Sequence, residues 1–574
     1  MRNADAIDPA SVPRRGWLPP LLLIAGLWAF VFPNLDQYGV TWDEALGDFF
    51  FGERYLSFFT SFDPAYLDFL SDPYPPERRP DLERSPFRDR PWEYYPVANV
   101  LAAATSAVLY RWLGWLDPFD GFHAVNPLLA ALLIAVFLPF LRRRFGASAA
   151  LAALVLLLSA PRVFCHLMAN VKDFPSMVAF TVAAVALFGA YEAGSARRLV
   201  AGGVLWGLAL GTKANALFLP FVLALVLLVD LARGTVPRAW RGRLRWLVAG
   251  SLGAGAAGAA TMVAAWPYLW ADPIGRFGAH LRYVGLRKEF IRPEDAAPVI
   301  EAVLLTTPPA FLLLVAAGLV PCLRRAWRGD RAAVLVLVWP LVVLGRYLLP
   351  AAVNFDGVRH FLELFPPLAA IAGLGAASVT AAVARRVPGR REEGRGGGSS
   401  PGRRPLAAAL LALLLVPGVA ATLGSHPFQI AYWNLFAGGP AGAYARGLPQ
   451  AGDYWGMSYR QGIDWLNEHA APGAALAVPV IEHAVYLVAP ERLREDVELL
   501  HLTTPYSPRL LREGLERLRR ESRRRPVYVM FVERREWMND LMLECLLTRT
   551  PVAAWQLDGA PLLYVYRYDQ GGGG

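Results

Sequence analysis

Ionisable and amide side chains recur in five short polar segments that separate long apolar runs. A carboxylate can take a proton from a hydroxyl group, and a Lys or Arg side chain can stabilise a developing negative charge. Charges at membrane depth are costly, so they usually face a cavity or one another. The segments are therefore predicted to line one cavity for an anionic, lipid-borne substrate. The candidate residues are Asp43, Glu44, His166, Asn170, Lys172, Asp173, Lys213, Asn215, Asp272, Arg359 and His360.

The apolar runs that position these segments indicate a polytopic α-helical membrane protein. Of the 574 residues, 55% are hydrophobic and 18% are charged, which is less charge than a soluble protein of this length usually carries. The runs are about 17 to 30 residues long, enough to cross a bilayer as helices. We expect about eleven membrane helices, over residues 17–35, 122–141, 147–163, 175–194, 199–213, 214–230, 246–268, 301–321, 331–350, 360–384 and 405–424.

Arginine clusters between the apolar runs predict the orientation of the chain. The formal net charge is +10, and the arginines gather in short loops, as they do on the cytoplasmic side of membrane proteins. We therefore expect a cytoplasmic N-terminus, the five polar segments on the outer face, and a plasma membrane or bacterial inner membrane as the location. The clusters are a weak signal for nucleic acid, and no nucleic-acid partner is expected.

The chain is predicted to have a membrane domain over residues 1–424 and an outer-face domain over residues 425–574. Residues 36–121 form a long first outer loop, within which residues 97–116 lie along the membrane surface because Arg and Trp side chains suit an interfacial helix. Residues 385–405 are rich in Arg, Gly and Ser and predict a basic cytoplasmic linker. The outer domain is expected to be a small α/β unit, with strands at 474–480 and 527–533 and a helix at 508–523.

Each group of candidate residues also has a purely structural interpretation. The acidic pair at 43–44 could cap a helix end, and the Lys–Asp pair at 172–173 could be a local ion pair. His166 could be a packing residue, and the Arg–His pair at 359–360 could anchor a helix end at the interface. Lys213 fits a structural role least well, because its neighbours Gly211, Thr212 and Asn215 resemble a polar lining.

The order of these segments resembles the membrane glycosyltransferases of the GT-C fold, in particular the family 39-like group. That group includes the protein O-mannosyltransferases and the aminoarabinose transferase of lipid A. The similarity covers about residues 15–470. It is carried by the acidic pair after the first helix, by the long first outer loop, and by three segments, SAPRVFCHLMANVKDFP (159–175), GLALGTKANALFLP (207–220) and the stretch 359–367.

This resemblance implies an inverting enzyme that moves a sugar from a polyprenyl phosphate to a hydroxyl group on a protein, lipid or glycan. The absence of a glycine-rich nucleotide-binding fingerprint in the sequence agrees with a lipid-linked donor. The implied catalytic residues are Asp43 as general base, Glu44, which orients it, and Asp173. The implied phosphate ligands are Lys172, Lys213, Arg359 and His360. Further implied cavity residues are His166, Asn170, Asn215 and Asp272.

No cofactor is required by this arrangement, and a divalent ion bridging Asp43 and Asp173 is the one addition left open. The three cysteines are far apart and lack metal-ligand spacing, so they predict neither a zinc site nor a disulfide framework. A lipid-linked sugar transporter or flippase is the alternative function, and a non-catalytic scaffold is a third. A transporter would place polar residues at the membrane midplane, often in two related halves, whereas here they gather on one face and no repeat is visible.

Overall fold

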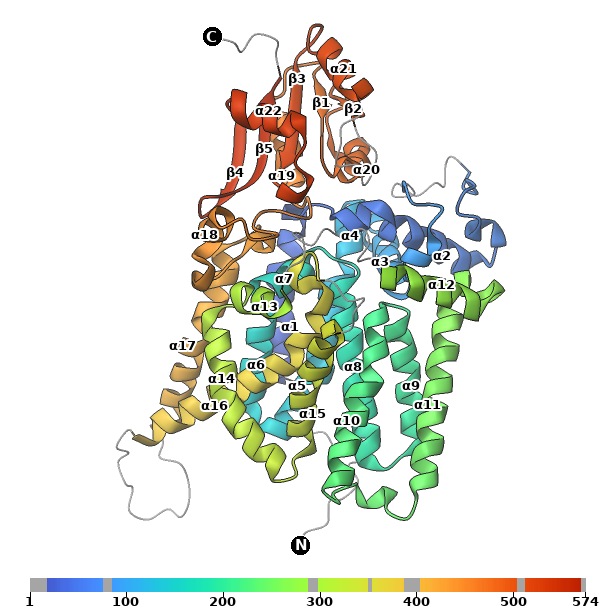
Figure 1. Cartoon of the computed structure of the whole chain (residues 1–574), viewed down its shortest axis with the longest axis vertical. Helices are drawn as coiled ribbons and strands as arrows, with labels where there is room; N and C mark the ends of the chain where they lie inside the picture. The colour runs from blue at the N-terminus through green and yellow to red at the C-terminus, as the bar shows by residue number, and fades with distance from the viewer. Residues whose placement is uncertain are drawn as a thin grey trace.

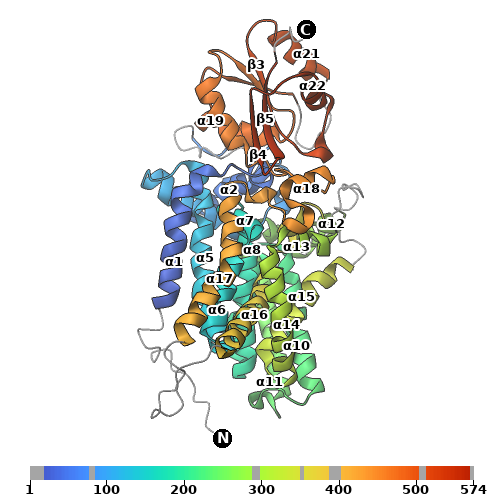
Figure 2. The same cartoon turned by 90° about the vertical axis from the view of Figure 1, so that its left-hand side faces the viewer.

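The protein is a helical bundle with a sheet-containing domain stacked on one end (Figures 1 and 2). The computed structural model describes residues 18–75, 85–286, 298–348, 354–386, 403–502 and 512–568. Most of the predicted basic linker, residues 387–402, lies outside the described residues.

Nine helical segments of the described residues are long and apolar enough to cross a membrane, and a bent pair, if counted as one span, makes ten. The predicted count of eleven is not confirmed. The expected span 147–163 is divided into α6 (Ala147–Leu158) and α7 (Pro161–Met168), which meet at 67°, and α9 has only 15 residues. The other bundle helices are α1 (Leu18–Val31), α5 (Val125–Phe145), α8 (Asp173–Ala193), α9 (Ala196–Leu210), α10 (Leu219–Ala232), α11 (Leu244–Ala265), α14 (Pro309–Trp327), α15 (Arg331–Gly345), α16 (Phe365–Arg386) and α17 (Arg403–Gly424).

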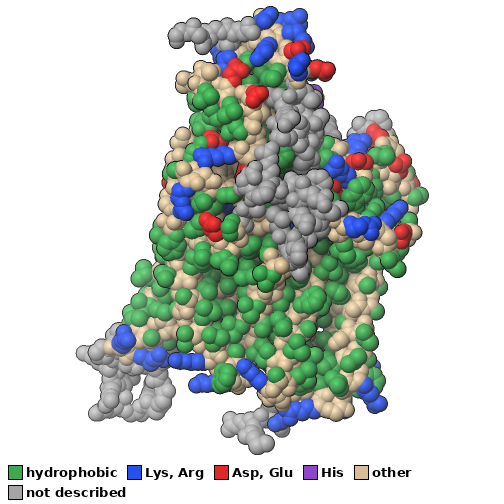
Figure 3. Space-filling model, in the orientation of Figure 1, with side chains coloured by type: hydrophobic (Ala, Val, Ile, Leu, Met, Phe, Trp, Pro, Cys, Tyr) green, Lys and Arg blue, Asp and Glu red, His purple; other side chains and the backbone are tan. Residues whose placement is uncertain are grey.

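The surface of the bundle matches a membrane environment. Figure 3 shows hydrophobic side chains covering the middle of the bundle, Lys and Arg side chains at its lower end, and charges of both signs at its upper end. Apolar side chains that face lipid replace the usual polar surface of a soluble protein. The chain is therefore an integral membrane protein.

Local sequence signals explain where the bundle helices begin and end. Helix α5 carries Arg142, Arg143 and Arg144 in its last turn and stops at Gly146, where cations favour the helix C-terminus. Helix α15 begins after Asp330, whose side chain accepts hydrogen bonds from the next helical N–H groups, as an N-cap residue does.

A layer of shorter helices lies across the upper end of the bundle (Figure 1). The predicted surface segment 97–116 forms most of α3 and the π-helical turn that follows it, and it is not among the candidate spans. The helices of this layer are α2 (Phe49–Ser61), α3 (Pro96–Ser106), α4 (Pro118–His123), α12 (Pro273–Leu286) and α13 (Val299–Thr306).

The C-terminal part of the chain contains a five-stranded sheet with strand order β2-β1-β3-β5-β4. The first three strands in that order are parallel, and the last two pairings are antiparallel. Both predicted strands and the predicted helix are present, as β1, β3 and α21. The elements are α18 (Gly439–Ala445), α19 (Tyr459–His469), β1 (Ala475–Ala477), α20 (Glu482–Arg492), β2 (Glu498–Leu500), α21 (Arg512–Glu521), β3 (Val527–Val532), α22 (Asp540–Thr548), β4 (Ala553–Leu557) and β5 (Ala560–Arg567).

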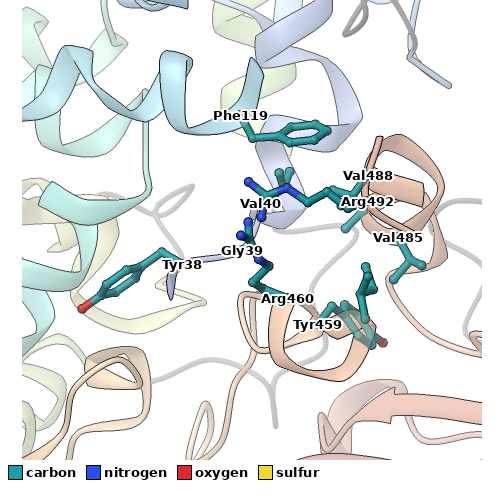
Figure 4. Close-up of a pocket in the computed structure, with 11 residues that line it drawn as sticks. Tyr38, Gly39, Val40, Phe119, Tyr459, Arg460, Val485, Val488 and Arg492 are labelled. Carbon is teal, nitrogen blue, oxygen red and sulfur yellow. The ribbon is translucent and has the colours of Figure 1, made fainter. Parts of the chain in front are cut away.

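This domain packs on residues 36–121, which follow α1, through α19 and α20. Figure 4 shows the seam, where Arg460 and Arg492 of these helices lie beside the strand-like segment 38–40 and Phe119 of α4. The guanidinium of Arg492 forms an ion pair with Asp117 and lies 5.2 Å from the Phe119 ring centroid. The two parts of the chain are thus held together by charge pairing and aromatic packing at the same place.

Candidate active site

The site forms where the segment after α1 meets α7, α8 and the turn before α16. The acidic pair lies at the start of a π-helical turn, Glu44–Asp48, for which Asp43 is the N-cap residue. A π-turn has i→i+5 hydrogen bonds and frequently marks a functional position in a helix. Because of this turn, Asp43 and Asp48 both contact the Nζ of Lys172, at 3.4 and 3.3 Å.

Three cations interleave with the acids of the site. The side chain of Lys213 forms an ion pair with Asp173 Oδ1, at the first residue of α8. The Nη1 of Arg359 lies 3.1 Å from Asp43 Oδ2 and 3.3 Å from Asp173 Oδ2, so one guanidinium joins segments that are far apart in the sequence. Asp43, Lys172, Asp173, Lys213 and Arg359 therefore form one continuous charge network, as expected from the sequence.

The acids of this network differ sharply in exposure. The side chain of Asp43 is 22% exposed, whereas those of Glu44, Asp48 and Asp173 are at most 1% exposed. Asp173 also accepts a hydrogen bond from the Asn170 side chain at 2.9 Å, so both of its oxygens are held. Asp43 is therefore the carboxylate of this group that a substrate can reach.

Glu44 is a buried connector between three segments. Its Oε2 accepts a hydrogen bond from the Thr41 N–H at 2.8 Å and lies 3.2 Å from His123 Nε2, and its Oε1 accepts from the Val171 N–H at 3.2 Å. Burial alone would raise the pKa of Glu44, but the His123 imidazole and the hydrogen bonds with Thr41 lower it below its usual value. Glu44 thus holds the loop of Asp43 against α4 and the segment before α8.

Asp48 has the opposite electrostatic environment. Its Oδ1 accepts a hydrogen bond from the Asn99 side chain at 3.1 Å. Burial, reinforced by the charge of Asp43, raises the pKa of Asp48 to about 7 although Lys172 acts against the shift. Asp48 therefore exchanges its proton near neutral pH, beside the same ammonium group that contacts Asp43.

The remaining predicted residues surround the network or lie apart from it. His166 and Asn170 contact each other at 2.9 Å below Asp173. The Asn215 side chain donates to the His360 carbonyl at 2.8 Å, and the His360 ring packs 4.4 Å from that of Phe355. Asp272 is exposed and accepts a hydrogen bond from the Gly275 N–H at the start of α12, so the structure does not bring it into the network.

Sequence reasoning missed several members of the site. Asp48 was missed because α-helical spacing would turn it away from Asp43, and only the π-turn aligns them. Asp356, which pairs with Arg359 at 2.7 Å, belongs to the same predicted polar segment as Arg359, but no role in the site was predicted for it. Trp455, whose ring lies 4.6 Å from the Arg359 guanidinium, and Arg534, which contacts Asp356 at 2.9 Å, come from distant segments and carry no local signal.

Backbone contacts with the C-terminal part of the chain fix the loop that leads into Asp43. The Gly39 N–H donates to the Met457 carbonyl at 3.1 Å, and the Trp42 N–H donates to the Trp455 carbonyl at 3.0 Å. A Cβ on Gly39 would lie 2.2 Å from the Met457 carbonyl oxygen, so only glycine fits this close approach. The position of Asp43 therefore depends on residues 455–457.

The sequence allows a divalent ion that bridges Asp43 and Asp173. Within the described ranges, no group of three or more His, Cys, Asp or Glu side chains has the geometry to hold a metal ion. The Arg359 guanidinium already bridges these two carboxylates.

One protein-family model matches part of the chain. Residues 119–253 match the family described as dolichyl-phosphate-mannose-protein mannosyltransferase. The matched segment includes Lys172, Asp173 and Lys213 of the charge network, and His123, which contacts Glu44. This match confirms, for that part of the chain, the resemblance to GT-C membrane glycosyltransferases predicted from the sequence. None of the curated proteins compared matches the chain.

Two solved structures are similar to the chain at low sequence identity. ArnT from Cupriavidus metallidurans, crystallised with undecaprenyl phosphate, is 17% identical, with 96% of this chain and 98% of that chain covered and a TM-score of 0.48. The oligosaccharyltransferase from Archaeoglobus fulgidus, tethered with an acceptor peptide, is 12% identical, with 85% of this chain and 64% of that chain covered and a TM-score of 0.43.

Proposed function

We propose that the protein is an inverting glycosyltransferase that moves a sugar from a polyprenyl phosphate to a hydroxyl acceptor at the outer membrane face. The observation that carries the proposal is the exposure of Asp43, at 22%, within a network whose other acids are buried. The family match over residues 119–253 supports the same class of reaction. The sugar is a hexose or pentose, and the acceptor belongs to a protein, lipid or glycan.

In the proposed reaction Asp43 acts as the general base. Its Oδ2 is held by Lys172 and Arg359, which fix the direction of the carboxylate. The acceptor hydroxyl attacks the anomeric carbon from the side opposite the phosphate and gives its proton to Asp43. The new C–O bond forms as the bond to the phosphate oxygen breaks, and the electron pair leaves with the polyprenyl phosphate.

The two lysines are the proposed ligands of the departing phosphate. Their side chains are 12% and 11% exposed at Lys172 and Lys213, and cations aimed at developing charge lower the barrier to its departure. Arg359 is 5% exposed and contacts three carboxylates, so its proposed role is to position Asp43. His360 remains a candidate ligand at the edge of the network.

The proposed topology places the site, and the domain formed by residues 425–574, outside the cytoplasm. The support is the arginine clusters at the lower end of the bundle (Figure 3), which the positive-inside rule assigns to the cytoplasm. Bacterial inner membrane is the proposed location, with the membrane domain spanning residues 1–424. In this arrangement Lys172, Lys213 and Arg359 supply the positive charge of the site. Whether transfer also needs a divalent ion is tested by adding a chelator to the transfer assay.

The test is transfer in reconstituted liposomes that contain polyprenyl-phosphate sugars and lipid or glycan acceptors. Asp43→Asn should lower the rate by about 10²- to 10⁴-fold, the usual worth of a general base, while Asp272→Asn, an acid outside the network, should leave it unchanged. Full transfer by the Asp43→Asn variant refutes the role of Asp43. Movement of unchanged lipid-linked sugar between leaflets, with no glycosylated product, would indicate the flippase instead.

A further inference from the structure

The most buried strand of the C-terminal sheet determines the position of Arg534. Strand β3 (Val527–Val532) is buried at every residue and lies in the middle of the strand order, and Arg534 follows it after one intervening residue. That residue, Glu533, donates its N–H to the Leu562 carbonyl of β5 at 3.0 Å, so the pairing of the sheet continues up to Arg534. A side chain supported by a rigid element is held precisely. The sheet therefore fixes where the Arg534 guanidinium lies.

The Arg534 guanidinium joins the sheet domain to segments beside the proposed base. Its Nη1 donates to the Tyr454 carbonyl at 2.6 Å, and its Nη2 donates to Asp356 Oδ1 at 2.9 Å. Its Cζ lies 4.9 Å from the ring centroid of Trp42, the residue before the base, and its Nε lies 3.7 Å from Glu536 Oε2. The Arg534 side chain is only 10% exposed, so this arginine belongs to the interior of the protein.

Asp356 has a backbone conformation that its surroundings must hold. Its φ angle is 55°, in the left-handed region that costs most residues with a Cβ about 1–2 kcal/mol, and such conformations persist only where neighbouring contacts fix them. Its Oδ1 accepts the hydrogen bond from Arg534, and its Oδ2 accepts from Nη2 and Nε of Arg359 at 2.7 and 3.2 Å. Each oxygen of Asp356 is thus bound by a different arginine.

The same series of contacts ends at the proposed base. Nη1 of Arg359 donates to Asp43 Oδ2 at 3.1 Å, and it belongs to the guanidinium whose other nitrogens bind Asp356. Because a guanidinium is planar and rigid, a movement of Asp356 also moves the Nη1 that holds Asp43. A continuous series of charge-assisted hydrogen bonds therefore leads from the end of β3 to the carboxylate of Asp43.

We propose that Arg534 is a positioning residue of the transferase and acts through Asp356 and Arg359. Arg534 fixes Asp356, which in turn orients Arg359, and Arg359 holds the carboxylate of Asp43 in the direction of the acceptor hydroxyl. This inference rests on the proposed glycosyltransferase function. It makes the sheet domain a part of the active site, because that domain supplies the residue on which the direction of the base depends.

The first experiment measures kinetic constants in the liposome transfer assay, with the donor and acceptor that the native protein uses. Arg534→Met should lower kcat about tenfold, the effect of one hydrogen bond to a charged group. KM for donor and acceptor should stay unchanged, because an interaction that acts only in the transition state affects kcat alone. Arg534→Lys keeps the charge without the planar fork, so its kcat should fall less.

Arg535→Met is the matched control for this experiment. Arg535 is the next residue in the chain, is exposed, and has its guanidinium 4.1 Å from the Tyr444 ring centroid. Its replacement should leave kcat and KM at the native values. Thermal unfolding of each variant shows the fraction that remains folded. A native kcat for Arg534→Met, or a change confined to KM, overturns the proposal.

The second experiment asks whether Arg534 acts through Asp356. Asp356→Asn should also lower kcat about tenfold. If one series of contacts carries both effects, the double variant should be about as slow as either single variant, whereas independent effects would multiply to about 100-fold. Multiplied effects would overturn the proposed series of contacts, since Arg534 would then act on the site by another route.

Hydrogen–deuterium exchange of the purified full-length protein tests the positioning without requiring activity. The N–H groups of Gly39 and Trp42 are hydrogen-bonded, so they should exchange slowly in the native protein. Arg534→Met should increase exchange in peptides that cover residues 38–48, and Arg535→Met should not. Unchanged exchange in these peptides overturns the proposal. Faster exchange in the Arg534→Met variant, when the native protein transfers no sugar, would refute the proposed function and retain the link between Arg534 and the loop.

Discussion

Replacement of Glu44 by Gln tests whether the two acids of the pair have different roles. Asp43 is the proposed base, whereas Glu44 is expected to hold the loop of Asp43 in place. Glu44 is 1% exposed and accepts hydrogen bonds at both oxygens, from Thr41 and Val171 N–H groups, with His123 as a further partner. A Gln side chain has one acceptor oxygen. Whichever way its amide is turned, an NH₂ group faces a buried donor.

The cost follows from these contacts. At least one hydrogen bond to a charged group is lost, worth about 1.5–3 kcal/mol, and a buried N–H is left unsatisfied, which costs about 1–3 kcal/mol. We therefore expect Glu44→Gln to destabilise the folded protein by about 3 kcal/mol and to reduce transfer by displacing Asp43. Asp43→Asn, at a partly exposed position, should lower the transfer rate by about 10²- to 10⁴-fold with much less effect on stability.

The assay is thermal unfolding of the purified protein in detergent, paired with transfer in liposomes. Glu468→Gln, at an exposed position of α19, is the control. The pKa of Glu44 is lowered in the folded protein, so its stabilising contribution is complete above the usual Glu pKa and is lost as the pH falls through the lowered value. The stability difference between the native protein and the Glu44→Gln variant should shrink under acid conditions. An unchanged unfolding midpoint at neutral pH would refute the connector role of Glu44.

Two further predictions follow from the neighbourhood of the pair. The pKa of Asp48 in the folded protein is raised to about 7, so ionisation of Asp48 opposes folding as the pH rises from the usual Asp pKa to 7. Asp48→Asn should therefore raise the unfolding midpoint at pH 8 and leave it unchanged near pH 4. An equal change at both pH values would contradict the assigned pKa. Gly39→Ala places a Cβ 2.2 Å from the Met457 carbonyl oxygen, whereas a Cβ on Gly26 meets nothing within 4 Å. Gly39→Ala should therefore reduce transfer at least tenfold, because strain of about 1–3 kcal/mol moves the loop of Asp43. Gly26→Ala should leave transfer unchanged. Equal transfer by the two Gly→Ala variants would show that the approach to Met457 does not position the loop.

Much of the network was predictable because the cost of charge in a membrane is a strong local signal. Lys172, Asp173, Lys213 and Arg359 stood out as isolated charges beside apolar runs, and the structure brings them together with Asp43.

What could not be predicted depends on backbone geometry and on distant contacts. The π-turn at 44–48 has no distinctive residue pattern, so the alignment of Asp48 with Asp43 was not visible. The predicted span 147–163 crosses the break between α6 and α7 because Ser159 and Ala160 interrupt neither its hydropathy nor its length, although Pro161 marks the start of α7. Trp455 and Arg534 belong to the C-terminal part of the chain. No local sequence pattern indicates that this part packs against the loop of Asp43.

The contacts of the Asp43 loop have a consequence for the timing of activity. His483 Nε2 lies 3.3 Å from the Trp42 carbonyl oxygen, although the two residues are 441 positions apart, and residues 455–457 pair with the backbone of the same loop. During synthesis the loop is made early and its partners are made late. The site therefore forms only after the ribosome has produced the sheet domain and that domain has docked. For most of its synthesis, the nascent chain has Asp43 but lacks the contacts that fix its position.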